Sequence, residues 1–263
     1  MKKLTTILFF SFSSLYSFSQ GSEIGIMLGG SYYMGELNPG KQFYRVKPAG
    51  GILYRKNFNP RYALKLSALY GTIEAYDADS ESESQQQRNL SFRSEVLDFS
   101  TQIEFNFLPF TIGNKEKLFS PYIFGGISVF KYNPEADLNG EWYELQPLKT
   151  EGHKYSLVQP AFPFGLGLKL SIGHKFAMGM EWGLRRTFND YIDDVSTTYA
   201  DPAQLREENG EIAVGLADRS LVKNGENTGL QRGNSKNNDW YSFAGITLTF
   251  KLLGKEQCVG VNK

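Results

Sequence analysis

Apolar residues recur at every second position through much of this chain, and this period of two constrains its fold most. The clearest segment is Leu97–Phe107, where the odd positions are apolar apart from Thr101 and the even positions are polar. Successive side chains of a strand point to opposite faces, so this segment predicts a strand with one apolar face. The period continues in Tyr62–Gly71, Ala161–Ile172, Phe176–Arg185 and Gly245–Leu252, and more weakly in Ile24–Met34, Pro48–Lys56 and Pro121–Tyr132. We therefore predict eight strands.

The connections between these segments alternate in length. Those at 57–61, 109–118 and 173–175 are short, whereas those at 35–45, 76–89, 133–155 and 188–239 are long. Short turns at one end and long loops at the other predict an all-β fold, an eight-stranded antiparallel up-and-down barrel. The loop 188–239 is expected to be partly helical, at 202–208 and 211–218, because Asp201 and Pro202 form a helix start and Gly210 interrupts it.

The polar face of the strands indicates a barrel embedded in a membrane. It is rich in glycine, with Gly25, Gly29, Gly71, Gly165, Gly167, Gly179 and Gly183. Glycine weakens a strand and gains nothing in water, whereas a narrow lumen needs small residues. The bulky apolar face ends in aromatics such as Tyr62, Tyr70 and Phe107, as at bilayer interfaces. The predicted structure is thus a transmembrane barrel in contact with outer-membrane lipid.

Five charged residues lie on the predicted lumenal face: Lys65, Glu104, Lys169, Glu181 and Arg185. Eight strands leave an interior just wide enough for side chains. We therefore expect a mutually paired, structural charge plug, with a proton or ion path as the alternative.

The N-terminus has the pattern of a secretory signal peptide. Lys2 and Lys3 precede an apolar run over 4–18, and small residues flank a cleavage point after Ser19. We predict a signal peptide at 1–19, one barrel domain at 20–263 and a tail at 254–263. Both termini are then expected on the periplasmic side of the outer membrane.

Charge and cysteine content exclude several classes of function. Lys plus Arg number 28 and Asp plus Glu number 28, which removes the basic surface of a nucleic-acid binder. The single Cys258 cannot form an internal disulfide or a cysteine-based zinc site. It is either an inert thiol or a partner contact through an intermolecular disulfide.

Chemistry-bearing motifs are sparse. His153 with Ser156 and the acids Asp190, Asp193 and Asp194 is the one candidate catalytic constellation, and loop acids near a histidine are common by chance. The acidic run from Asp77 to Glu83 lacks the glycine and the final glutamate of a calcium loop, so a solvated loop is expected. We predict no enzymatic activity, no cofactor, no metal and no small-molecule substrate.

Six segments together resemble one known family. They are GGSYYMGELNP from Gly29, NFNPRYALKLSALYGTI from Asn57, RNLSFRSEVLDFSTQIEFNFLPF from Arg88, LQPLKTEGHKY from Leu145, PFGLGLKLSIG from Pro163 and EWGLRRTFNDYIDDVSTTYADP from Glu181. The set is similar to the PorG family, the outer-membrane component of the type IX secretion system of Bacteroidota, which is also catalogued as a domain of unknown function. The resemblance implies an eight-stranded barrel that associates with the periplasmic ring of the PorK lipoprotein and PorN, in support of protein export and gliding motility.

The expected function is therefore a scaffold or anchor for that ring. Two alternatives stay open from the sequence. One is a small adhesin or membrane tether that binds through its long outer loops, and the other is a surface enzyme built around His153.

Overall fold

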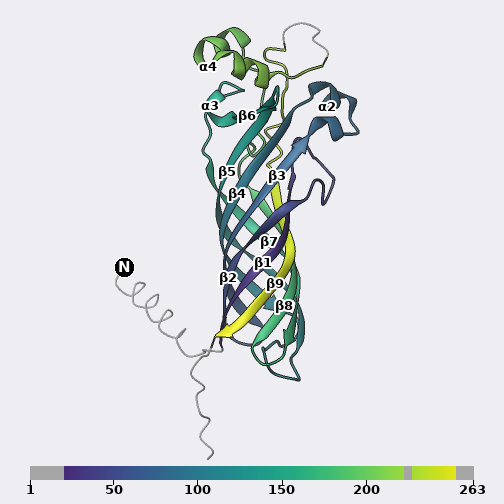
Figure 1. The fold of residues 1–263 in the computed structure, drawn as a ribbon, viewed down its shortest axis with the longest axis vertical. Coiled ribbons are helices and arrows are strands. Elements are labelled where there is room, and N and C mark those ends of the chain that lie inside the picture. The colour runs from purple at the N-terminus through teal and green to yellow at the C-terminus, as the bar shows by residue number, and fades with distance from the viewer. Residues whose placement is uncertain (1–20, 222–226, 253–263) are drawn as a thin grey trace, which may run out of the picture.

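The computed structural model describes residues 21–221 and 227–252, which form a barrel with a structured head at one end (Figure 1). The strands are β1 (Ser22–Met34), β2 (Lys47–Asn57), β3 (Tyr62–Tyr76), β4 (Ser91–Asn106), β5 (Phe119–Leu138), β6 (Glu141–Glu144), β7 (Val158–Ile172), β8 (Phe176–Thr187) and β9 (Trp240–Leu252). The helices are η2 (Asp77–Asp79), α2 (Glu83–Arg88), α3 (Leu145–Leu148) and α4 (Pro202–Ala217). The helices and β6 lie at the long-loop end of the barrel (Figure 1).

Eight of these strands close into an antiparallel barrel, as predicted. The sheet runs β4-β3-β2-β1-β9-β8-β7-β5, and a β4–β5 pairing joins its two edges. Strands β1 and β9 pair along their whole length, from Ser22 opposite Leu252 to Met34 opposite Trp240. The two ends of the described chain therefore lie side by side at the short-turn end.

The strands on one side of the barrel extend beyond their predicted ends. Strand β5 has 20 residues, and β6 continues its sheet as a hairpin in which Leu138 pairs with Glu141. The prediction that 76–89 and 133–155 are loops was therefore wrong in part. Besides the strand residues of β5 and β6, these ranges contain η2, α2 and α3. Beyond the lipid no alternation of apolar and polar residues is required, and backbone pairing continues without leaving that pattern in the sequence.

The helix in the long loop forms as predicted. Asp201 caps α4, because its carboxylate accepts a hydrogen bond of 2.8 Å from the Ala203 amide, and Pro202 occupies the first turn. Gly210 breaks the helix with φ 85° and ψ 179°, a conformation that suits glycine.

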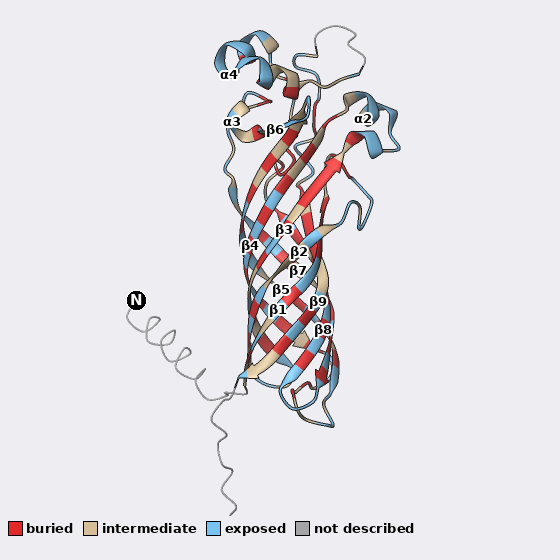
Figure 2. Cartoon of the chain, viewed as in Figure 1, coloured by how far each residue is buried: buried red, intermediate tan, exposed pale blue. Residues whose placement is uncertain are grey.

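The two faces of the barrel differ as the alternation predicted (Figure 2). Large apolar side chains are exposed around the outer wall, among them Ile127 at 71% and Leu28 at 63%. The inner face is buried and crowded: a Cβ added at Gly167 would stand 2.5 Å from the ring of Tyr122. A water-exposed wall of this kind would be costly, so the outer wall is a lipid-facing surface.

Candidate functional site

The lower lumen holds a connected set of buried ion pairs with Glu104 of β4 at its centre. The carboxylate of Glu104 accepts hydrogen bonds from the Arg55 guanidinium at 2.7 and 3.2 Å and from Lys169 Nζ at 2.6 Å. Lys65 Nζ lies 3.6 Å from Oε1 of the same Glu104 carboxylate. Glu104 is fully buried, so these cations compensate a charge that water does not reach.

Two further acids complete this lumen charge network, which we define as Glu23, Arg55, Lys65, Glu104, Lys169 and Glu181. Glu181 pairs with Lys65 at 2.6 Å and accepts the Tyr122 hydroxyl at 2.8 Å, and Glu23 pairs with Arg55 at 2.7 Å. Three cations thus face three carboxylates. Glu23 and Arg55 were not among the predicted lumenal charges, although both stand in phase with the glycine-lined face of their strands.

Arg185 was expected in this network but lies apart from it. Its Nη1 donates to the Gly183 carbonyl at 2.6 Å, and its guanidinium stacks 4.8 Å from the Phe243 ring. Its Nε and Nη2 have no hydrogen-bond partner among the described residues, and neither has Oδ1 of the buried Asp98. The prediction that all five lumenal charges pair with one another was therefore wrong for Arg185. The register between strands places Arg185 away from Glu104 and Glu181, and the sequence does not state that register.

The loop 107–118 packs against the barrel at the short-turn end, where the Phe110 ring lies 6.0 Å from Lys169 Nζ. Phe110 and Ile112 pack with Ala177 in a small apolar cluster, and the Gly113 amide donates to the Ser171 hydroxyl at 3.0 Å. A groove of about 340 Å³ remains beside this loop and is lined by Gly21, Glu23, Asn57, Pro60, Phe110, Thr111, Ile112, Asn114, Lys117 and Lys251.

At the opposite end, the described parts of the long loop, 188–221 and 227–239, contribute buried polar groups to the head. Arg232 pairs with Glu151 at 2.9 Å and lies 3.7 Å from the Asp194 carboxylate. Asp194 accepts hydrogen bonds from the Thr150 and Tyr155 hydroxyls. Burial raises the pKa of Asp194 to about 6, against the opposing effect of Arg232.

Three carboxyl groups meet above the barrel mouth. The Tyr33 hydroxyl lies 2.5 Å from Asp193 and 2.6 Å from Asp239. One hydroxyl carries one proton, so both contacts are hydrogen bonds only if one of the two carboxyls is itself protonated. Burial favours such a protonated carboxyl, because it raises the pKa of Asp239 to about 7, that of Asp190 to about 8 and that of Asp193 well above its usual range.

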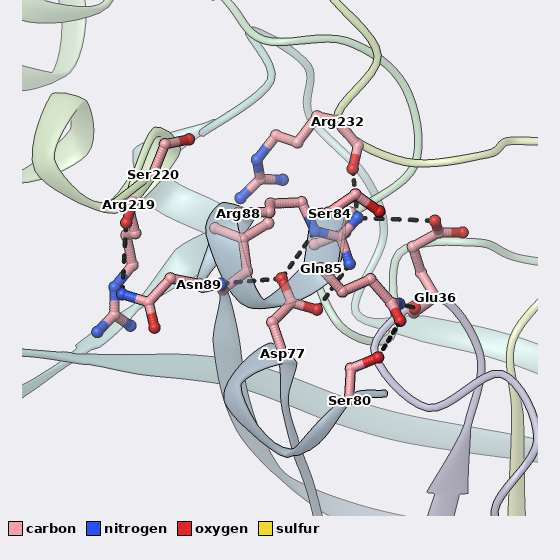
Figure 3. Close-up of polar contacts among 12 residues, drawn as sticks. Glu36, Asp77, Ser80, Ser84, Gln85, Arg88, Asn89, Arg219, Ser220 and Arg232 are labelled. Carbon is pink, nitrogen blue, oxygen red and sulfur yellow. Dashed lines mark hydrogen bonds and ion pairs between the residues drawn. The ribbon is translucent and has the colours of Figure 1, made fainter. Parts of the chain in front are cut away.

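One acid of the run predicted to be a solvated loop, Asp77, is instead part of a buried network (Figure 3), whereas Asp79, Glu81 and Glu83 are exposed as predicted. Asp77 is fully buried and receives two hydrogen bonds from Arg88, at 2.7 and 2.8 Å. Arg88 also donates to the Arg232 carbonyl at 2.5 Å and lies 3.6 Å from Glu36. The prediction failed for Asp77 because its partner Arg88 is itself held by the Arg232 carbonyl, 144 residues further along the chain.

The candidate catalytic residues do not assemble. His153 and Ser156 are exposed, and the Ser156 hydroxyl donates to the Val158 carbonyl, whereas Asp190, Asp193 and Asp194 are buried. Within residues 21–221 and 227–252, no group of three or more His, Cys, Asp or Glu side chains is arranged to hold a metal ion. Cys258 and the predicted signal peptide lie outside the described residues.

An apolar outer wall around a buried, charged and narrow lumen defines a small transmembrane β-barrel of the outer-membrane type. No helix within the described ranges is long and apolar enough to cross a bilayer. The chain belongs to a family described as a domain of unknown function, DUF6089, whose family model matches residues 2–212.

Solved structures similar in fold to this chain include an outer-membrane protein, a surface protein and an attachment invasion locus protein. OprG from Pseudomonas aeruginosa is 9% identical, with 90% of this chain and 98% of that chain covered and a TM-score of 0.44. Neisserial surface protein A is 8% identical, with 89% and 98% covered and a TM-score of 0.43. Ail of Yersinia pestis is 10% identical, with 88% and 98% covered and a TM-score of 0.38. No curated protein sequence matches the chain.

Proposed function

We propose that this chain is a non-enzymatic outer-membrane subunit of the type IX protein secretion machinery. In this role the barrel anchors or scaffolds the periplasmic ring formed by a PorK-like lipoprotein and a PorN-like protein, in support of protein export and gliding motility. The main support for this proposal is the filled lumen. Six buried charged side chains, connected by ion pairs, occupy the interior, so the barrel suits an anchor in the membrane better than a solute channel.

The orientation follows from the same proposal. The short turns and both chain ends would face the periplasm, and the structured head would lie outside the cell. The groove lined by Asn114, Lys117 and Lys251 then offers the ring a polar contact surface at the short-turn end. The resemblance of six long segments to the PorG family supports this partner.

The test is a pull-down of the tagged barrel in mild detergent, scored for the ring proteins. A Lys115→Glu, Lys117→Glu variant reverses two charges at the short-turn end, and we expect it to reduce capture at least tenfold. The matched control, Lys154→Glu with Lys236→Glu, reverses two charges at the head and should capture the ring normally. Absence of ring proteins from the wild-type pull-down would refute the scaffold role, as would normal secretion of signal-bearing cargo after deletion of the gene.

The second candidate is an adhesin or membrane tether that acts through its long outer loops. The observation in its favour is the ordered head, whose Arg232–Glu151 and Arg88–Asp77 pairs give the loops a fixed shape. Under this function, gene deletion leaves cargo secretion intact and reduces attachment of cells to a surface.

A further inference from the structure

A second groove, of about 580 Å³, lies at the long-loop end of the barrel, where the lipid-facing wall stops. It is lined by Met34, Gly35, Glu36, Pro39, Ser82, Ser84, Gln85, Arg186, Asn234, Lys236, Asn237, Asn238 and Trp240. We call it the rim groove. Its volume is that of a small-ligand site.

Three lining residues of the rim groove, Met34, Trp240 and Arg186, form one row across three strands. Trp240 of β9 pairs with Met34 of β1 on one side and with Arg186 of β8 on the other. Arg186 pairs in turn with Phe162, an exposed aromatic of the outer wall. Aromatic residues at the end of an apolar band mark the level of the lipid headgroups, so this row lies at that level.

The groove carries positive charge that no carboxylate neutralises. Neither Arg186 nor Lys236 forms an ion pair with any acid in the described ranges, and both are exposed. Glu36 is the one acid that lines the groove, and Arg88 lies 3.6 Å from its carboxylate. Gln85, visible beside Glu36 in Figure 3, donates its amide to the Glu36 carbonyl at 2.7 Å and so braces this wall.

The remaining lining is rich in groups that hydrogen-bond to sugars. Asn234, Asn237 and Asn238 supply amides that both donate and accept, while the Trp240 indole offers a flat apolar face. Asn238 Nδ2 donates one hydrogen bond to the Thr187 carbonyl and Asn234 Oδ1 accepts one from the Lys236 amide, which leaves the second N–H of Asn238 and the Asn234 amide nitrogen for a ligand. Guanidinium and ammonium groups beside them suit phosphate oxygens. The Arg186 guanidinium lies 5.9 Å from the centroid of the Trp240 ring, and Phe164 packs edge-on against the same ring.

We propose that the rim groove binds the phosphorylated sugar headgroup of a glycolipid in the surrounding leaflet. Arg186 and Lys236 contact the phosphate, the asparagine amides contact the sugar hydroxyls, and the acyl chains lie along the apolar wall below Trp240. The identity of the leaflet rests on the orientation proposed above, in which the long loops lie outside the cell.

The experiment uses the purified full-length mature chain in non-ionic detergent, with bound lipid counted by native mass spectrometry. The probes are a phosphorylated glucosamine-disaccharide lipid A, the same lipid after phosphatase treatment, phosphatidylglycerol, and free glucosamine 6-phosphate. The site variant is Arg186→Gln with Lys236→Gln. The control, Lys131→Gln with Lys154→Gln, removes the same charge from exposed positions that do not line the groove.

We expect the site variant to bind phosphorylated lipid A at least tenfold more weakly and the control to stay within twofold of the wild type. Equal losses in both variants, or equal binding of phosphatidylglycerol, would show general attraction of anionic lipid and overturn the site. Equal binding of the dephosphorylated lipid would overturn phosphate recognition, and equal affinity for free glucosamine 6-phosphate would overturn the lipid source. Ring capture by the site variant reports separately on the proposed function, since that contact lies at the other end of the barrel.

Discussion

Replacing Glu104 by glutamine tests whether the lumen charge network holds the barrel together. The wild-type network balances three cations against three carboxylates, so Glu104→Gln leaves one uncompensated positive charge inside the membrane. Glutamine has nearly the same volume, so the variant creates no cavity and isolates the electrostatic contribution. Removing one partner from a buried ion pair costs about 3–5 kcal/mol.

At about 1.4 kcal/mol per tenfold change, that cost is a factor of roughly 10²–10⁴ in the unfolding equilibrium. The assay is urea unfolding of the barrel in phospholipid vesicles, followed by the gel shift between folded and unfolded forms. Glu104→Gln combined with Lys169→Met restores neutrality, and we expect it to be more stable than the single variant by about 2 kcal/mol. Glu135→Gln, which breaks the partly exposed pair with Arg93, should cost less than about 1 kcal/mol.

A Glu104→Gln variant within about 0.5 kcal/mol of the wild type would refute the reasoning. It would mean that water reaches the network and screens its charges.

Three further predictions concern the head, the lumen and the tail. The folded-state pKa values of Asp190, about 8, and Asp239, about 7, exceed the ordinary 3.8, so the folded head retains protons that the unfolded chain loses. Head stability should therefore fall as pH rises from about 4 to 8, measured by proteolysis of the loop 188–239, and Asp190→Asn should flatten the profile. In planar bilayers we expect no discrete conductance from the wild type, and steps that Lys169→Met alters would favour the ion path. For Cys258, a partner disulfide predicts a high-mass band on non-reducing gels that Cys258→Ser removes, whereas an inert thiol predicts no such band.

The lipid-facing strands could be predicted because the bilayer acts on every second side chain. Leu97–Phe107 shows this best, since nearly every outward position there is apolar. The cap of α4 was predictable for a similar reason: Asp201, Pro202 and Gly210 act on their own backbone within a few residues. Structure that depends on interactions within a few residues can therefore be predicted from the sequence.

The head and the details of the lumen depend on contacts between distant residues, and no period in the sequence records them. Tyr33 meets Asp239 across 206 residues of sequence, and Arg88 meets the backbone of Arg232 across 144. Inward charges were recognisable on the clearest strands, whereas Arg55 and Glu23 lie on weakly alternating ones. Arg185 was predicted to face the lumen, but the sequence does not reveal which residues of the other strands lie at the same height along the barrel axis.

The pairing of β1 with β9 has a consequence for how the chain folds. These strands are the first and last of the barrel, so the seam closes only when the final strand arrives, and its loop-closure entropy is the largest in the fold. Meanwhile the charges of the lumen charge network come from β1, β2, β3, β4, β7 and β8, and an open sheet would expose them to lipid. Membrane insertion and seam closure are therefore expected to occur as one cooperative step, with partly inserted sheets too costly to accumulate.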